Sequence, residues 1–434
     1  MVPSRLLLWL SGLFMASGFA LYWLPVATMP WASLCAVFVL ATLLDAWLAR
    51  AVPHLRIERR LAGVWPVGTW NDVTLTLHHE GGRHARVQVF DDYPTHWELE
   101  GLPFEAALAA GRFHTQRYRL RAIQRGNVSL GLSFLRILSP LGLWWRRARE
   151  GVESHVRVFP DFSKLLGHTL HATDQRVPRL GTIRKRRRGE GTDFRQLREY
   201  RQGDSLRVID WKATARQLKP ISRDYQEERD QQVIFLLDTG RRMLAHDGDK
   251  SHFDHALDAV LTLAWVAQKQ GDAVGVMTFG RESRWLAPQK GHAGLDRLLS
   301  GVYDLQAGEV APDYLLAAQE LMSRIRKRAF IVLITNLRDE DDVALRDACQ
   351  MMASRHMVLC ASMRETILDD TLAAPVYQFS DALRLAGTEF YLAQRREAIR
   401  RLGMRAHNLI DVTPQHLSAS LVDRYLEIKE SGQL

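Results

Sequence analysis

The sequence predicts a multidomain protein in which an N-terminal hairpin of two transmembrane helices precedes a β-sandwich and a Rossmann-like α/β domain. Three observations support this fold class: a long uncharged N-terminal run, a central region of short alternating strands, and a C-terminal region in which apolar strands and helical patterns alternate. At 434 residues the chain is too long for one ordinary domain. We place the boundaries at 1–50 for the helices, 51–162 for the sandwich, 163–230 for a charged connector and 231–434 for the α/β domain.

The N-terminal region has no charged residue between Arg5 and Asp45. One membrane-spanning helix needs about 20 apolar residues, so the run is long enough for two helices separated by a tight turn at LPVATMP. Trp23 and Trp31 flank this turn, where amphipathic rings favour the headgroup layer. Arginines at both ends of the run predict that these ends are cytoplasmic. A cleaved signal peptide is the alternative for the first apolar run, but a second one follows directly. We interpret Asp45 as a boundary residue, in preference to a proton relay.

Residues 51–162 are predicted to form an immunoglobulin-like β-sandwich. The segments DVTLTLHH, HARVQVFDD and GNVSLGLSFLRI alternate with period two, and glycine-containing turns separate them. Asp91 and Asp92 stand before Tyr93-Pro94, a pattern that favours a turn over a metal site.

The region after Gln232 alternates between apolar strands and helical patterns. The strands QVIFLLD, DAVGVMTF, RAFIVLITN, MVLCASM and NLIDVT are rich in β-branched residues and leucine, as in parallel strands buried on both faces. Strand–helix alternation implies right-handed crossovers and helices on both faces of the sheet.

The connector is the most charged part of the chain and contributes to a formal net charge of +9. We interpret the run Arg184 to Arg188 as a solvated loop, with anionic lipid or an acidic partner as the alternative. Nucleic acid is not expected, because no interleaved aromatic platform accompanies the basic residues.

The segment REYRQGDSLRVIDWKATARQ (Arg198 to Gln217), followed by the strand ending at Asp238, resembles the domain-of-unknown-function 58 family, or DUF58. The segments RGNVSLG, SPLGL and VRVFP extend the resemblance into the sandwich. The family consists of membrane-anchored bacterial proteins with a von Willebrand factor A-type domain, often encoded beside MoxR-type AAA+ ATPases. The resemblance therefore implies a bacterial inner (plasma) membrane location with the soluble domains on the cytoplasmic side. It also implies a MoxR-type ATPase as partner and leaves the client protein unidentified.

The central motif has two interpretations that are compatible. Arginine forks pair well with carboxylates, so one interpretation is a rigid ion network that clamps the connector to the sheet, with Tyr200 and Trp211 as apolar anchors. The other is a docking surface for a partner. The residues to which we assign these roles are Arg198, Glu199, Tyr200, Gly203, Asp204, Arg207, Asp210, Trp211 and Arg216.

A von Willebrand factor A-type domain can bind Mg²⁺ at a metal-ion-dependent adhesion site built from Asp-x-Ser-x-Ser, a threonine and a later aspartate. Here Asp238 takes the first position, whereas Gly240 and Arg242 stand where the two serines belong. Asn336 replaces the later aspartate, and Pro312 lies near the threonine position. Mg²⁺ requires oxygen ligands, so we predict a degenerate site with no bound metal and no cofactor. Asp238 is then expected to pair with Arg242 or to stabilise its turn.

The sequence favours a protein that is not an enzyme. It has no glycine-rich phosphate loop with lysine, no His-Glu-x-x-His and no Gly-x-Ser-x-Gly motif. We expect a membrane-anchored interaction or scaffold protein that works with a MoxR-type AAA+ ATPase in assembly or maturation of a protein complex. The alternative is a metal-dependent receptor for acidic ligands, which the lost serines disfavour.

Overall fold

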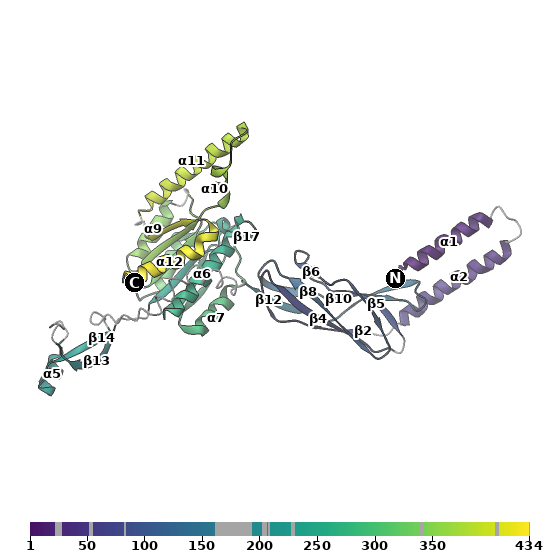
Figure 1. Ribbon diagram of the computed structural model, residues 1–434, viewed down its shortest axis with the longest axis horizontal. Helices are drawn as coiled ribbons and strands as arrows, with labels where there is room; N and C mark the ends of the chain where they lie inside the picture. Colours follow the sequence, from purple (N-terminus) through teal and green to yellow (C-terminus); the bar gives the residue numbers. More distant parts are fainter. Residues whose placement is uncertain are drawn as a thin grey trace. The chain divides into compact units, whose positions relative to one another are not determined.

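Figure 1 shows a computed structural model of the chain. It describes residues 1–21, 28–51, 55–81, 84–160, 193–201, 206, 209–226, 231–338, 342–403 and 408–433. The chain divides into two compact units, Met1–Asp161 and Phe162–Leu434.

The first unit begins with two apolar helices, α1 (Arg5–Leu21) and α2 (Thr28–Leu48). Neither has a charged face, which is the pattern of a helix surrounded by apolar groups. Within the described residues, only Met29–Leu48 is long and apolar enough to cross a membrane, and Arg5–Ala20 is a shorter apolar helix. The helices contact each other: the rings of Phe14 and Phe38 stack at 4.5 Å, and Trp31 Nε1 donates to Ser17 Oγ at 3.2 Å.

Three β-sheets and a shared core make up the rest of the first unit. A five-stranded sheet has the order β1-β11-β10-β5-β7, a four-stranded sheet β2-β4-β8-β6 and a three-stranded sheet β3-β12-β9. Alternate residues such as Val73, Leu75 and Val87 are buried in this core, as the period-two pattern predicts. The strands are β1 (Val2–Pro3), β2 (Leu55–Arg60), β3 (Val64–Pro66), β4 (Trp70–His79), β5 (Ala85–Phe90), β6 (Glu98–Glu100), β7 (Phe104–Leu108), β8 (Phe113–Arg121), β9 (Gly126–Leu130), β10 (Ser133–Leu138), β11 (Trp144–Glu150) and β12 (Ser154–Phe159).

Asp45, near the end of α2, joins the helices to the sheets. Its buried carboxylate accepts hydrogen bonds from Ser139 Oγ at 2.5 Å, Leu141 N at 2.9 Å and Leu143 N at 3.2 Å. One turn earlier in the helix, the carbonyl of Thr42 accepts from Trp144 Nε1 at 3.0 Å. Asp45 is therefore a buried anchor for the loop between β10 and β11, a role that its position in the sequence did not indicate.

Asp91 has a different role from the turn residue predicted from its sequence context. It is fully buried, and both of its carboxylate oxygens accept hydrogen bonds from the Arg59 guanidinium, at 2.5 and 2.9 Å. Tyr118 and Ser133 also donate to it. Four donors on one carboxylate satisfy a charge that would otherwise be costly to bury, so Asp91 is a core residue of the first unit.

The described part of the connector is a small hairpin with a helix. β13 (Asp193–Glu199) pairs with β14 (Ile221–Gln226), and α5 (Trp211–Gln217) lies between them in the chain. Asp210 caps α5, because its side chain accepts from the backbone N–H groups of Lys212 and Ala213, both at 3.0 Å. These hydrogen bonds, together with one from Arg223, lower the pKa of Asp210.

The second unit contains a six-stranded sheet with the order β19-β18-β15-β20-β21-β22. All its strands are parallel except the edge strand β19. The five segments predicted as parallel strands are confirmed as β15 (Gln232–Asp238), β18 (Ala273–Phe279), β20 (Phe330–Thr335), β21 (Met357–Met363) and β22 (Leu409–Val412); β19 is Trp285–Gln289. The strand order reverses between β15 and β20, and ligand crevices of α/β sheets lie at such a switch point.

Helices cover both faces of this sheet (Figure 1). One core contains residues of α6 (His252–Lys269), α7 (Gly291–Val302) and α12 (Leu417–Glu430), and the other contains residues of α8 (Tyr314–Arg324) and α9 (Asp342–Ala353). α6 begins with a capping box between Ser251 and Asp254.

Helices α10 (Thr366–Ala373) and α11 (Phe379–Arg401) are much less buried than α6, α8 and α12. No residue of α10 is buried, and in α11 only Arg395 and Ala398 are. The helical pattern EFYLAQRREAIRRLG begins at Glu389, whereas α11 begins ten residues earlier. Figure 1 shows the first half of α11 and α10 extending beyond the sheet. We call the segment 366–390 the arm.

Candidate functional site

The carboxyl ends of β15 and β20 bring Asp238 and Thr335 together at the switch point. Thr335 Oγ1 donates to Asp238 Oδ2 at 2.7 Å, and Gly240 N donates to Asp238 Oδ1 at 2.7 Å. Tyr314, at the start of α8, places its hydroxyl 2.9 Å from Thr335 Oγ1. Both carboxylate oxygens of Asp238 thus hold protein donors. This geometry matches the expected role of stabilising the turn.

The loop before α8 packs directly on this turn. Arg241 N donates to the carbonyl of Val310 at 2.9 Å, and Gly308 N donates to the carbonyl of Thr239 at 2.9 Å. A Cβ atom at Gly240 would lie 2.8 Å from the Val310 carbonyl oxygen and 3.0 Å from Pro312 Cδ. A serine therefore does not fit at position 240 unless the loop moves. Pro312, which we predicted near the threonine position, is thus part of the loop that packs on Gly240.

Burial raises the pKa of Asp238 to about 6. The hydrogen bonds from Gly240 and Thr335 and the charge of Arg242 lower this pKa, but the effect of burial is larger. Arg242 lies in the short helix η4 (Arg241–Leu244) and is itself buried. The charge of Arg242 contributes only to lowering this pKa, and the expected pairing of Arg242 with Asp238 stays a prediction. An acid that is fully buried and half-protonated near pH 6 is a poor cation ligand at lower pH.

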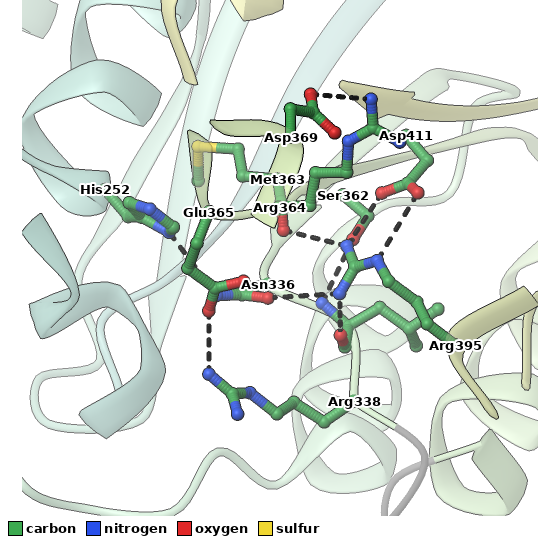
Figure 2. Close-up of polar contacts among 11 residues, drawn as sticks. His252, Asn336, Arg338, Ser362, Met363, Arg364, Glu365, Asp369, Arg395 and Asp411 are labelled. Carbon is green, nitrogen blue, oxygen red and sulfur yellow. Dashed lines mark hydrogen bonds and ion pairs between the residues drawn. The ribbon is translucent and has the colours of Figure 1, made fainter. Parts of the chain in front are cut away.

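Asn336 belongs to a polar cluster at the ends of β20 and β21 (Figure 2). Its Nδ2 donates to Glu365 Oε1 at 3.2 Å and lies 3.3 Å from His252 Nδ1. Burial lowers the pKa of His252, which favours the neutral ring as acceptor. Glu365 is also paired with Arg338 at 2.7 Å. The amide that replaces the expected aspartate is thus part of a hydrogen-bonded cluster.

Arg395 of α11 is the centre of this cluster (Figure 2). It is buried and donates to Ser362 Oγ at 2.7 Å, to the Met363 carbonyl at 2.8 Å and to the Leu337 carbonyl. Its guanidinium also forms an ion pair with Asp411 of β22 at 2.7 Å. One side chain therefore connects the ends of β20, β21 and β22 to α11, and through α11 to the arm.

The structure places six of the nine motif residues, and Gly203, Asp204 and Arg207 lie outside the described residues. Asp210 pairs with Arg223 at 2.9 Å, and Glu199 lies 3.4 Å from Lys219. Arg198 donates to the Glu199 carbonyl at 3.2 Å. Arg216 is exposed and Tyr200 is half-buried. Trp211 is 70% exposed, so in the described structure it is not the buried anchor that we expected.

Residues 196–405 match the family model described as "Protein of unknown function DUF58". This DUF58 match covers just under half of the chain and includes the whole central motif, the switch point and the arm. No curated protein sequence matches the chain.

Three solved structures show distant likenesses to parts of the chain. An aerotolerance-related membrane protein from Bacteroides fragilis is 16% identical, with a TM-score of 0.30, over 46% of this chain and 99% of that chain. Proximal thread matrix protein 1 from the mussel byssus is 9% identical, with a TM-score of 0.30, over 45% and 46%. Native alpha-2-macroglobulin from Escherichia coli is 18% identical, with a TM-score of 0.22, over 25% and 17%. These scores are too low to support an argument about function.

The sequence did not single out Thr335, Tyr314, Glu365 or Arg395 in this region of the DUF58 match. Thr335 could have been found, because it directly precedes Asn336 at the end of a predicted strand. Arg395 lies in a helix with several arginines, and nothing in the sequence distinguishes the buried one. Among the described residues, no group of three or more His, Cys, Asp or Glu side chains is placed to hold a metal ion.

We expect no saturable heat when Mg²⁺ or Mn²⁺ is titrated into the detergent-purified chain. The reason is that Asp238 holds two protein donors, Gly240 offers no hydroxyl, and Asn336 is hydrogen-bonded elsewhere. Isothermal titration calorimetry makes the measurement. Micromolar binding that Asp238→Ala abolishes would contradict the prediction and favour the metal-dependent receptor.

Proposed function

We propose that this chain is a non-enzymatic interaction protein of the bacterial inner membrane that works with a MoxR-type AAA+ ATPase in assembly or maturation of a protein complex. The arm is the single observation that supports this proposal most. Tyr377 and Phe379 are each 84% exposed at its tip, and Ile367, Leu383 and Phe390 are also exposed. Contiguous exposed apolar surface marks interaction sites, and aromatic residues are frequent among the residues that dominate binding energy.

The arm is also connected to the polar cluster through helix α11. Arg395 connects the strand ends to α11 at one end of this helix, and the apolar tip is at the other. A partner bound to the tip therefore contacts a helix whose base is fixed by buried hydrogen bonds. This arrangement supports a docking element more than a flexible loop. The von Willebrand factor A-type identity of the α/β domain is part of the same proposal.

Membrane anchoring rests on α1 and α2 and on their junction with the sheets. Asp45 and Trp144 connect the end of α2 to the sheets, and β1, just before α1, pairs with β11. Removal of α1 as a signal peptide would also remove this edge strand, which favours retention. Both helix ends then lie on the side of the sheets, and the flanking arginines favour the cytoplasmic side.

The arm is tested by affinity capture of a MoxR-type AAA+ ATPase on the full chain in detergent. We expect Tyr377→Ser with Phe379→Ser to weaken capture at least tenfold, because truncation of aromatic anchors of this kind costs about 2 kcal/mol or more. Leu316→Ser with Val343→Ser is the matched control, since these residues are exposed on α8 and α9. It is expected to change capture less than twofold.

A second variant separates the arm from the connector. Trp211→Ser with Leu218→Ser removes one exposed apolar group from the central motif and one directly after it. If this variant loses the ATPase while the arm variant retains it, the docking surface is the connector. If neither variant affects capture, both surfaces are ruled out as the contact.

A further inference from the structure

The outer face of the five-stranded sheet has a groove of about 1200 Å³ at the end where α1 begins. Its lining includes Arg5 and Leu6 of α1, Leu141 of the loop that Asp45 holds, and Arg86 and Arg136 of the strands. A second groove of about 660 Å³ lies on the same face, where Gln88 and Arg136 also line it. The two together form a continuous surface that starts at the first turn of an apolar helix.

This surface has an unbalanced positive charge. Arg136 of β10 stands directly opposite Arg147 of β11, and both are exposed. Like charges directly opposite each other in a sheet are destabilising. Among the described residues, neither guanidinium has an ion pair or a hydrogen bond. Glu105, the acid in the lining, is engaged by Gln88 Nε2 at 2.6 Å.

The rest of the surface is apolar and aromatic. Phe90 and Phe134 line the second groove, where Arg149 lies over the Phe134 ring at 5.0 Å. Leu6 and Leu141 line the end nearest to the helices. A ligand that fits all of this has an anionic group between Arg136 and Arg147 and apolar chains toward α1.

We propose that this groove binds the phosphate headgroup of an anionic phospholipid. The position decides between lipid and other anions, because Arg5 and Leu6 form part of the wall and belong to a helix that we propose to enter the bilayer. Anything held there is at the depth of the lipid headgroups. Anionic lipids are concentrated in the cytoplasmic leaflet, the side predicted for this unit. The inference therefore rests on the proposed membrane anchoring.

The test is native mass spectrometry of the full chain in detergent with dioctanoyl-phosphatidylglycerol, dioctanoyl-phosphatidylcholine or inorganic phosphate. We expect tighter binding of phosphatidylglycerol, which Arg136→Gln with Arg147→Gln weakens at least tenfold. Arg117→Gln with Arg157→Gln removes the same charge from exposed positions on other sheets and is expected to have less than a twofold effect. Without lipid, the groove variant should melt at the same or a higher temperature, because it removes a like-charge pair.

Two results would overturn the lipid site. One is equal affinity of the groove variant and the unchanged chain for phosphatidylglycerol. The other is inorganic phosphate that binds as tightly as the lipid and displaces it, which would mean a site for free anions. Carbonate extraction of membranes tests the anchoring separately: release of the chain would overturn the membrane anchor, whereas the groove is judged by the binding data.

Discussion

Replacing Arg395 with alanine is expected to destabilise the second unit by about 3 to 5 kcal/mol, the usual cost of breaking a buried ion pair from one side. The substitution leaves Asp411 without its cation and the carbonyls of Leu337 and Met363 without their donor. Hydrogen-exchange mass spectrometry of peptides from β20 and β21 measures the loss in the full chain, because these peptides report on the second unit alone.

The neighbouring residue supplies the control for this prediction. Arg396 is on the same helix, is exposed, and donates only to the carbonyl of Leu392 among the contacts described. Arg396→Ala is expected to change the protection of β20 and β21 by less than about 0.5 kcal/mol. Equal protection in the Arg395→Ala and Arg396→Ala variants would show that the polar cluster does not hold the strand ends together.

Asp238→Asn is expected to stabilise the second unit above pH 6 by on the order of 3 kcal/mol. The carboxyl has an ordinary pKa of 3.8 and a folded pKa of about 6, and each pKa unit corresponds to about 1.4 kcal/mol. The folded state binds the Asp238 proton more tightly than the unfolded state does. The stability that this proton contributes is fully present below pH 3.8 and is lost as the pH rises through 6. Asparagine is neutral at every pH, so the variant does not lose this stability.

The surrounding hydrogen bonds allow this substitution. Asparagine can accept from Gly240 N and donate to Thr335 Oγ1, and Thr335 can then donate to Tyr314, because either hydroxyl of that pair can be the donor. Urea unfolding between pH 4 and 8 makes the measurement, with the exposed Asp249→Asn as the control. If Asp238→Asn lowers stability at pH 7, the ionised form with Arg242 is what the fold requires.

Much of the second unit could be predicted from the sequence because its strands are buried on both faces. QVIFLLD and FIVLIT are uninterrupted apolar runs, and they are strands along their full length. The partners of Asp238 could not be predicted in the same way. Thr335 meets it only because β20 lies beside β15, an order that a strand pattern does not specify.

The first unit shows the same limit. Arg59 follows the second helix in the sequence and reads as a membrane-flanking charge, yet it is buried against Asp91, 32 residues later. His252 lies next to Ser251, the N-cap residue of α6, yet it is buried beside Asn336. In each pair the two residues are polar and distant in sequence, and local periodicity carries no information about such pairs.

Strand β1 has a practical consequence for anyone who produces this protein. Val2 and Pro3 pair with Trp145 and Trp144 at one end of β11, where the outer edge would otherwise offer unpaired N–H and C=O groups to a second molecule. Proline lacks an N–H group, so the added strand is a poor template for further growth. We expect that a bulky group fused directly in front of Val2 would crowd this pairing and promote self-association.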